Sequence, residues 1–144
     1  MPSPPTRGAS PNIAAKTAAK TGSKTVMIVE DNPLNMKLFA DLLEVSGYRT
    51  LRFTEGTNAR ERALEHRPDL LLIDVQLPHK SGLEIIGEVK ATPEIADIPA
   101  VAVTAFAMKG DEDKVRQAGF DDYISKPIVV KDFLEKVKRY IGDG

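Results

Sequence analysis

The stretch "LLLIDVQLPHKSG", residues 70–82, decides the expected fold. Its first four residues, Leu70 to Ile73, are apolar without a break, which is typical of a strand buried on both faces of a sheet. Asp74 follows at the point where this strand should leave the core. A carboxylate beside a buried strand is costly unless another group pairs with it or a cation binds it. Asp74 is therefore the first candidate for a functional residue.

The segments around this strand alternate between short apolar runs and longer stretches with helical periodicity. We expect strands at residues 25–30, 48–53, 69–73, 100–105 and 121–125. Helices are expected within residues 31–47, at 55–67, around Ile85 to Val89, at 107–118 and from Val130 to Ile141. Short connections between alternating strands and helices indicate an α/β fold, with a doubly wound sheet of five parallel strands and five helices.

The first helix has clear start and stop signals. Asn32 is a suitable N-cap, Pro33 suits the first helical position, and Gly47 ends the helix. Helical spacing predicts that the apolar residues of this segment face the core. These residues are Leu34, Leu38 and Leu42, with Phe39 and Leu43.

Length and composition indicate one globular domain that follows a different kind of segment. The 144 residues include 42% hydrophobic side chains, which is enough for a core. No apolar run reaches the roughly 18 residues of a membrane span. Residues 1–23 are rich in Pro, Ser, Thr and Ala, which predicts a disordered tail, with an organelle transit peptide as the alternative. Residues 24–144 are the expected domain.

Charge and cysteine content exclude several classes of function. Residues 1–23 contribute +3 to a net charge of −1, so the expected domain is mildly acidic. Because phosphate contacts need clustered Lys and Arg, we expect no direct binding to nucleic acid. The chain has no cysteine, which excludes disulfides and thiolate metal sites and fits a reducing compartment such as the cytoplasm.

Polar residues stand at the carboxyl ends of four expected strands. Glu30 and Asp31 follow the first strand, Asp74 the third, Thr104 the fourth and Lys126 the fifth. These ends meet at one edge of a parallel sheet, where ligands bind in such folds. Two carboxylates about 4 Å apart repel by roughly 4 kcal/mol at an effective dielectric near 20, so the cluster needs a cation or a proton. Oxygen donors of this kind suit Mg²⁺.

This set of groups is suited to phosphoryl transfer, in which positioning and charge neutralisation provide most of the catalysis. Asp74 would be the nucleophile, and Mg²⁺, Thr104 and Lys126 would bind the phosphoryl oxygens. Each residue also has a plainer interpretation, since an Asp after a strand is often a turn or cap residue and acids are common where a helix begins. The coincidence at four different strand ends favours the functional interpretation.

Four motifs resemble, in order and spacing, the receiver domain of bacterial two-component response regulators. The resemblance covers about residues 24–142. The motifs are "VEDNPLNMKLFADLLEVSGY" (29–48), "LLIDVQLPHKSG" (71–82), "VAVTAFAMKG" (101–110) and "YISKPI" (123–128). This resemblance implies a flavodoxin-like, CheY-like receiver fold and no enzymatic turnover on outside substrates.

The resemblance also implies a role for each site residue. Asp74 becomes the phosphoacceptor, and Thr104 and Lys126 bind the phosphate. The implied metal ligands are Glu30, Asp31, Asp74 and the backbone carbonyl of Gln76, with Mg²⁺ as the cofactor. Thr104 and Tyr123 are the implied switch residues, and the Lys126–Pro127 bond is expected to be cis. The acidic pair is Glu-Asp rather than Asp-Asp, a variation that the family allows.

The implied partners are a sensor histidine kinase or a histidine phosphotransfer protein, and a downstream protein at the 107–142 face. The sequence most resembles stand-alone receivers that act in cell-cycle and polarity control. A relay that passes its phosphate to a phosphotransfer protein is the alternative within the family. An aspartate-nucleophile phosphatase is the alternative from another class. It would have a second Asp two residues after the nucleophile, where this chain has Gln76.

Overall fold

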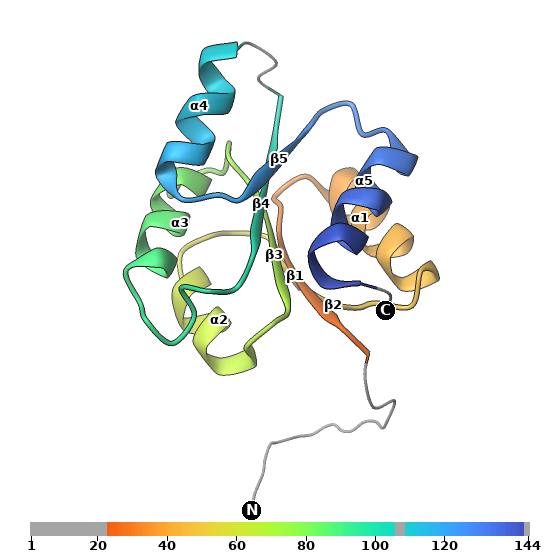
Figure 1. Ribbon diagram of the computed structural model, residues 1–144, viewed down its shortest axis with the longest axis horizontal. Helices are drawn as coiled ribbons and strands as arrows, with labels where there is room; N and C mark the ends of the chain where they lie inside the picture. Colours follow the sequence, from red (N-terminus) through yellow and green to blue (C-terminus); the bar gives the residue numbers. More distant parts are fainter. Residues whose placement is uncertain (1–22, 106–108, 143–144) are drawn as a thin grey trace, which may run out of the picture.

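The protein is a single parallel sheet with helices on both faces, the α/β fold expected from the sequence. The computed structural model describes residues 23–105 and 109–142. Its elements in chain order are β1 (Thr25–Val29), α1 (Pro33–Val45), β2 (Arg49–Phe53), α2 (Ala59–His66), β3 (Leu70–Asp74), α3 (Gly82–Lys90), β4 (Ala100–Thr104), α4 (Lys109–Ala118), β5 (Asp122–Ser125) and α5 (Val130–Ile141). Helices α2, α3 and α4 cover one face of the sheet, and α1 and α5 cover the other (Figure 1).

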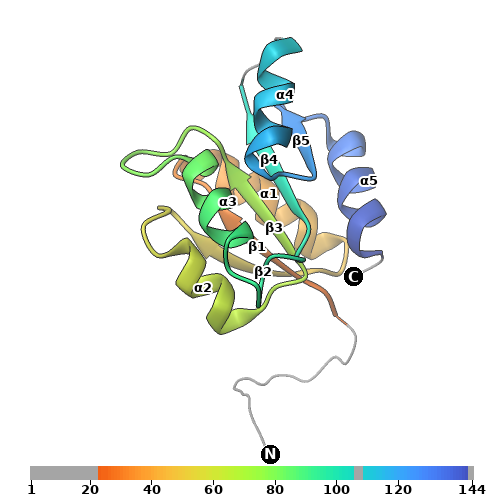
Figure 2. The same cartoon turned by 60° about the vertical axis from the view of Figure 1, so that its left-hand side comes forward.

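The strand order β2-β1-β3-β4-β5 places the three most apolar strands at the centre of the sheet. All strand pairs are parallel, and Val29 of β1 lies opposite Ile73 of β3. Every residue of β3 and β4 is buried, which explains why the sequence of these strands does not alternate. Helices α4 and α5 lie on either side of the edge strand β5 (Figure 2).

Two apolar cores stabilise the sheet, one on each face. The core under α2, α3 and α4 includes Ile85, Ile86 and Val89 of α3, as the periodicity predicted. The core under α1 and α5 contains Phe39 and Phe133, whose rings stack with their centroids 5.5 Å apart. This ring pair holds α1 against α5.

The predicted buried face of α1 was partly wrong. Phe39 and Leu43 are buried, together with Met36 and Ala40. Leu34, however, is 79% exposed and Leu38 is 37% exposed. The buried and the exposed residues both recur at helical spacing, and the rotation of the helix about its axis determines which of them face the sheet. The Asn32 side chain fixes the start of that helix by accepting hydrogen bonds from the backbone of Leu34 and Asn35.

The second helix is shorter than predicted, because it begins at Ala59 and not at residue 55. Its C-terminal end is as expected. Arg67 adopts a left-handed conformation with φ of 46°, and Pro68 prevents the helix from continuing. In the described part of the chain, no helix is long and apolar enough to cross a membrane.

The predicted tail at residues 1–23 lies outside the described residues except for its last position. The described chain is tied into the sheet from Lys24, whose carbonyl accepts a hydrogen bond from the Arg49 backbone N–H at 2.8 Å. Thr25 donates its N–H to the Asp69 carboxylate at 2.8 Å. We therefore propose that the domain begins at residue 24.

Deletion of residues 1–22 is expected to leave the thermal midpoint within about 3 °C of the full chain, a change of under roughly 1 kcal/mol. The reason is that all five strands and the described residues of both cores lie C-terminal to residue 24. Differential scanning calorimetry of both proteins is the measurement. A midpoint lower by 10 °C or more would mean that the deleted segment stabilises the domain.

Candidate functional site

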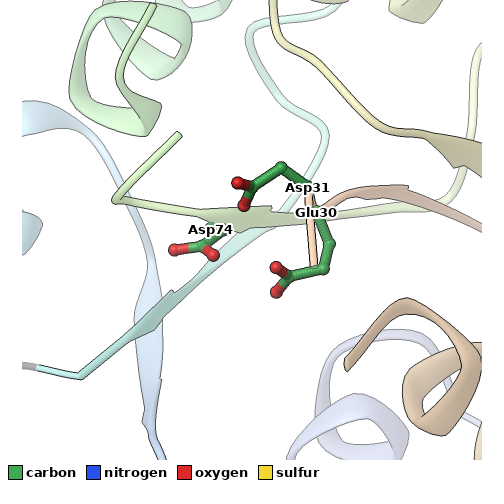
Figure 3. A group of neighbouring side chains, drawn as sticks. All are labelled: Glu30, Asp31 and Asp74. Carbon is green, nitrogen blue, oxygen red and sulfur yellow. The ribbon is translucent and has the colours of Figure 1, made fainter. Parts of the chain in front are cut away.

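Three carboxylates converge at the carboxyl ends of β1 and β3 (Figure 3). Glu30 and Asp31 follow β1, Asp74 is the last residue of β3, and one oxygen of each lies within 4.8 Å of the others. Glu30 is 1% exposed and Asp74 2% exposed, whereas Asp31 is open to solvent. The parallel pairing of β1 with β3 brings these residues together, as the sequence predicted.

Both oxygens of Asp74 have a defined partner. The Lys126 ammonium donates to Oδ2 at 3.0 Å, and the Gln76 backbone N–H donates to Oδ1 at 2.9 Å. Lys126 comes from the loop after β5, where the Lys126–Pro127 peptide bond is cis. Its ammonium is also 3.6 Å from the Oε1 atom of Glu30. Asp74 is therefore held in one orientation by groups from two different segments.

The close approach of these charged groups shifts the pKa values of Glu30 and Lys126. Burial raises the pKa of Glu30 to about 7. The hydrogen bond from the Asn32 backbone N–H lowers this pKa, and the negative charge of Asp74 raises it further. Burial alone would lower the pKa of Lys126, but its hydrogen bond to Asp74 and the charges of Asp74 and Glu30 raise it above its usual value. Lys126 is therefore a permanent cation facing the carboxylates.

The carboxylate cluster fits a hard divalent cation. Within the described residues, the buried Oε1 atom of Glu30 has no hydrogen-bond partner. Such an unsatisfied oxygen, beside two more carboxylates at short range, is the kind of donor set that Mg²⁺ binds together with water molecules. The backbone of Gln76 is fixed next to this cluster by its hydrogen bond to Asp74.

Thr104 and Tyr123 lie on one face of the sheet, beside the site. Thr104 ends β4, is buried, and pairs with Ser125 of β5, whereas Asp74 pairs with Val103 one position earlier. Tyr123 lies two positions before Ser125, so its side chain leaves the sheet on the same side as that of Thr104. The Tyr123 ring is partly exposed and lies near the side chains of Arg116 and Lys136.

The sequence reasoning missed two features of the structure, one at the site and one at the start of β5, away from the carboxyl ends of the strands. Gly82, the first residue of α3, packs against the end of β3. A Cβ atom at Gly82 would lie 2.5 Å from the Asp74 carbonyl oxygen and 2.8 Å from the Val75 Cα atom. The only signal was a glycine eight residues after Asp74. Asp122, a buried acid in β5, was also missed, because an Asp-Asp pair at a strand start is usually exposed.

Comparison with known proteins decides the family. Residues 26–138 match the model of the response regulator receiver domain. The chain belongs to this family. It is 59% identical over 121 residues to the polar-differentiation response regulator DivK of Brucella anthropi, covering 84% of this chain and 98% of that protein. It is 58% identical over 122 residues to DivK of Brucella ovis, covering 85% and 99%.

Solved receiver structures show the same fold. The receiver domain of a Pseudomonas aeruginosa sensor histidine kinase has a TM-score of 0.77 and 32% identity over 85% of this chain and all of that chain. That structure has a magnesium ion coordinated in its active site cleft. A yeast receiver domain, Ssk1, crystallised with the histidine phosphotransfer protein Ypd1, has a TM-score of 0.77 and 25% identity, covering 83% and 89%.

Proposed function

We propose that this receiver accepts a phosphoryl group on Asp74 from a phosphohistidine and then signals by binding another protein. The observation that carries this proposal is the geometry of Asp74, a buried carboxylate oriented by Lys126 and Gln76 beside two further acids. The similarity to DivK supports a role in polarity and cell-cycle control. The absence of cysteine from the sequence fits a place in the cytoplasm.

Asp74 performs the nucleophilic step. One of its oxygens forms the new bond to phosphorus, while the bond from phosphorus to the imidazole nitrogen of the donor breaks and that nitrogen keeps the electron pair. Lys126, already 3.0 Å from Asp74, faces the transferred phosphoryl oxygens. Thr104 ends β4 at the same edge of the sheet, and its hydroxyl would donate a hydrogen bond to them. Fixed partners of this kind lower the barrier by positioning and charge stabilisation.

Glu30, Asp31, Asp74 and the Gln76 carbonyl are the groups that would hold Mg²⁺. When bound, the ion supplies charge neutralisation for the phosphoryl oxygens and offsets the repulsion among the acids.

Phosphorylation is expected to require Mg²⁺, with incorporation at least about tenfold lower in EDTA, because the three acids otherwise repel the incoming phosphate. The measurement is intact-protein mass after incubation with acetyl phosphate, with either Mg²⁺ or EDTA. Asp31→Asn is the matched variant, since it removes one exposed carboxylate that would bind the metal and leaves the two buried carboxylates, Glu30 and Asp74, in place. Equal incorporation by the wild type in both buffers would exclude a metal role.

An exposed apolar surface beside the site suits a histidine-bearing partner. Leu34 and Leu38 of α1 and Val129 and Val130 at the start of α5 are all exposed. Helices α1 and α5 contact each other and both begin at the edge of the sheet that carries Asp74. Exposed apolar residues around a reactive group are typical of a protein docking site. We propose that a helical histidine kinase or phosphotransfer domain binds here.

Leu34→Asp is expected to slow transfer from a phosphorylated histidine phosphotransfer protein by at least about tenfold, because a buried charge opposes docking. Acetyl phosphate should still phosphorylate the variant, since an acid in the first turn of a helix does not weaken the fold. Val45→Asp is the matched control, because Val45 is 88% exposed at the other end of the same helix. Equal transfer rates for both variants would place the docking surface elsewhere.

The proposed downstream surface is the 107–142 face, and residues 106–108 lie outside the described residues. A hollow of about 230 Å³ opens on this face between β5 and the start of α5, lined in part by Tyr123, Val129 and Lys136. Phosphate at Asp74 would draw the Thr104 hydroxyl toward it, and the Tyr123 ring would then move inward. Transfer kinetics separate this role from a relay, which loses its phosphate rapidly to a phosphotransfer protein.

A further inference from the structure

Asp122 joins two helices across the edge of the sheet. It is the first residue of β5 and is 6% exposed. Its carboxylate contacts Arg116 of α4 at 3.3 Å and Lys136 of α5 at 3.2 Å. Burial would raise the pKa of Asp122, but the Tyr123 backbone N–H, Lys136 and the Tyr140 hydroxyl together hold it below its usual value. Asp122 is therefore a buried anion that binds a cation from each side of β5.

Asp122 also lies 3.9 Å from the more exposed Arg139, but the two cations that it binds more closely, Arg116 and Lys136, lie beside the Tyr123 ring. The Arg116 guanidinium carbon is 5.8 Å from the ring centroid, and the Lys136 ammonium is 5.2 Å from it. Both distances are within the roughly 6 Å over which a cation is attracted to an aromatic face. The same ammonium donates to the Tyr123 carbonyl at 2.7 Å, and Arg116 donates to the Asp121 carbonyl at 2.9 Å.

The hydroxyl group of Tyr123 also has a partner, in addition to the two cations beside the ring. The carboxylate of Glu112, on α4, interacts with the Tyr123 hydroxyl and raises its pKa. The outward position of Tyr123 is thus stabilised by α4 and α5 together. If the ring moved inward toward Thr104, these contacts would be lost while Arg116 and Lys136 stayed at Asp122.

We infer that Asp122 is a positioning residue for the switch, which fixes Arg116 and Lys136 beside Tyr123 and so favours the outward ring of the unphosphorylated protein. This inference rests on the proposed function, in which the ring moves inward after phosphorylation. A two-state equilibrium of this kind responds to any group that contacts one state better than the other. Asp122 therefore sets how much of the protein is active without phosphate.

The test is fluorine NMR of the full chain labelled with 3-fluorotyrosine. The chain has three tyrosines, at positions 48, 123 and 140, and Tyr123→Phe identifies the Tyr123 resonance by its disappearance. Beryllofluoride, a stable phosphoryl mimic, defines the resonance position of the phosphorylated form in the wild type. In Asp122→Asn without the mimic, we expect the resonance to move toward that position, with the population ratio of inward to outward ring raised about tenfold.

Matched variants separate positioning from a loss of folding. Arg116→Gln and Lys136→Gln each remove one cation that flanks the ring, and each should produce part of the same shift. Asp121→Asn is the control, because its carboxylate contacts the Ala100 backbone N–H and Lys90 and does not bind these two cations. The shift should be absent in this control.

The inference is overturned if the Tyr123 resonance stays at its wild-type position in Arg116→Gln, Lys136→Gln and Asp122→Asn. It is equally overturned if Asp121→Asn gives the same shift. A wild-type resonance that does not respond to beryllofluoride would instead contradict the proposed function, because no inward state would then be reached. The two failures are thus distinguishable in one series of spectra.

Discussion

Asp74→Asn is expected to reduce phosphoryl incorporation at least about a hundredfold, to the detection limit. An amide oxygen is a poor nucleophile, and Asp74 is the carboxylate that Lys126 approaches more closely, at 3.0 Å against 3.6 Å for Glu30. Loss of a nucleophile removes the reaction, whereas loss of an orienting group only slows it. The measurement is intact-protein mass after incubation with acetyl phosphate and Mg²⁺.

Asp69→Asn is the matched control for this experiment. Asp69 immediately precedes β3, at the opposite end of the strand from Asp74, and its carboxylate accepts a hydrogen bond from Thr25. The control should incorporate phosphate as the wild type does. Substantial incorporation by Asp74→Asn, with an unchanged circular dichroism spectrum, would contradict the assignment of the nucleophile.

Gly82→Ala is expected to destabilise the domain by about 2 kcal/mol and to slow phosphorylation. The added Cβ would lie 2.5 Å from the Asp74 carbonyl oxygen, and this neighbour is backbone that moves only if α3 or the end of β3 moves. Overpacking of this kind typically costs about 1–3 kcal/mol. Because the displaced backbone carries Asp74, the proposed nucleophile, the phosphorylation rate should fall as well.

Gly87→Ala provides the opposite result within the same helix. Among the described residues, no atom apart from the backbone of α3 and the two adjacent residues lies within 4 Å of a Cβ built at Gly87, so alanine fits without strain. Alanine is favoured over glycine in a helix by roughly 1 kcal/mol, so this variant should be more stable than the wild type. Urea unfolding of both variants is the measurement. If Gly82→Ala matches Gly87→Ala in stability, the close contact with β3 is not important.

The edge of the sheet that carries the candidate site could be predicted because parallel strands place their carboxyl ends together. Once the strand ending at Asp74 was recognised as central, Glu30, Thr104 and Lys126 had to lie at the same edge. The ends of helices were predicted reliably where a cap or a steric clash sets them. Asn32 caps the start of α1, and Pro68 prevents α2 from continuing. These features depend on a few neighbouring residues and not on the packing of the whole domain.

Other features depend on tertiary packing, which periodicity does not specify. The rotation of α1 on the sheet left Leu34 exposed although its spacing matched a buried face. The ion pairs of Asp122 depend on Arg116 of α4 and Lys136 of α5, two long side chains that reach β5 from different helices. The sequence positions of Arg116, Asp122 and Lys136 do not indicate that these side chains meet, because α4, β5 and α5 come together only in the folded domain.

The most direct test of the central claim is to locate the phosphoryl group itself. The protein is phosphorylated with acetyl phosphate and Mg²⁺, reduced with borohydride, which converts an aspartyl phosphate to homoserine, and digested for peptide mass spectrometry. The account predicts reduction at position 74 alone, with Glu30 and Asp31 unmodified. Reduction at either of those acids, or phosphate that resists borohydride because it is bound to a hydroxyl or an imidazole, would contradict it.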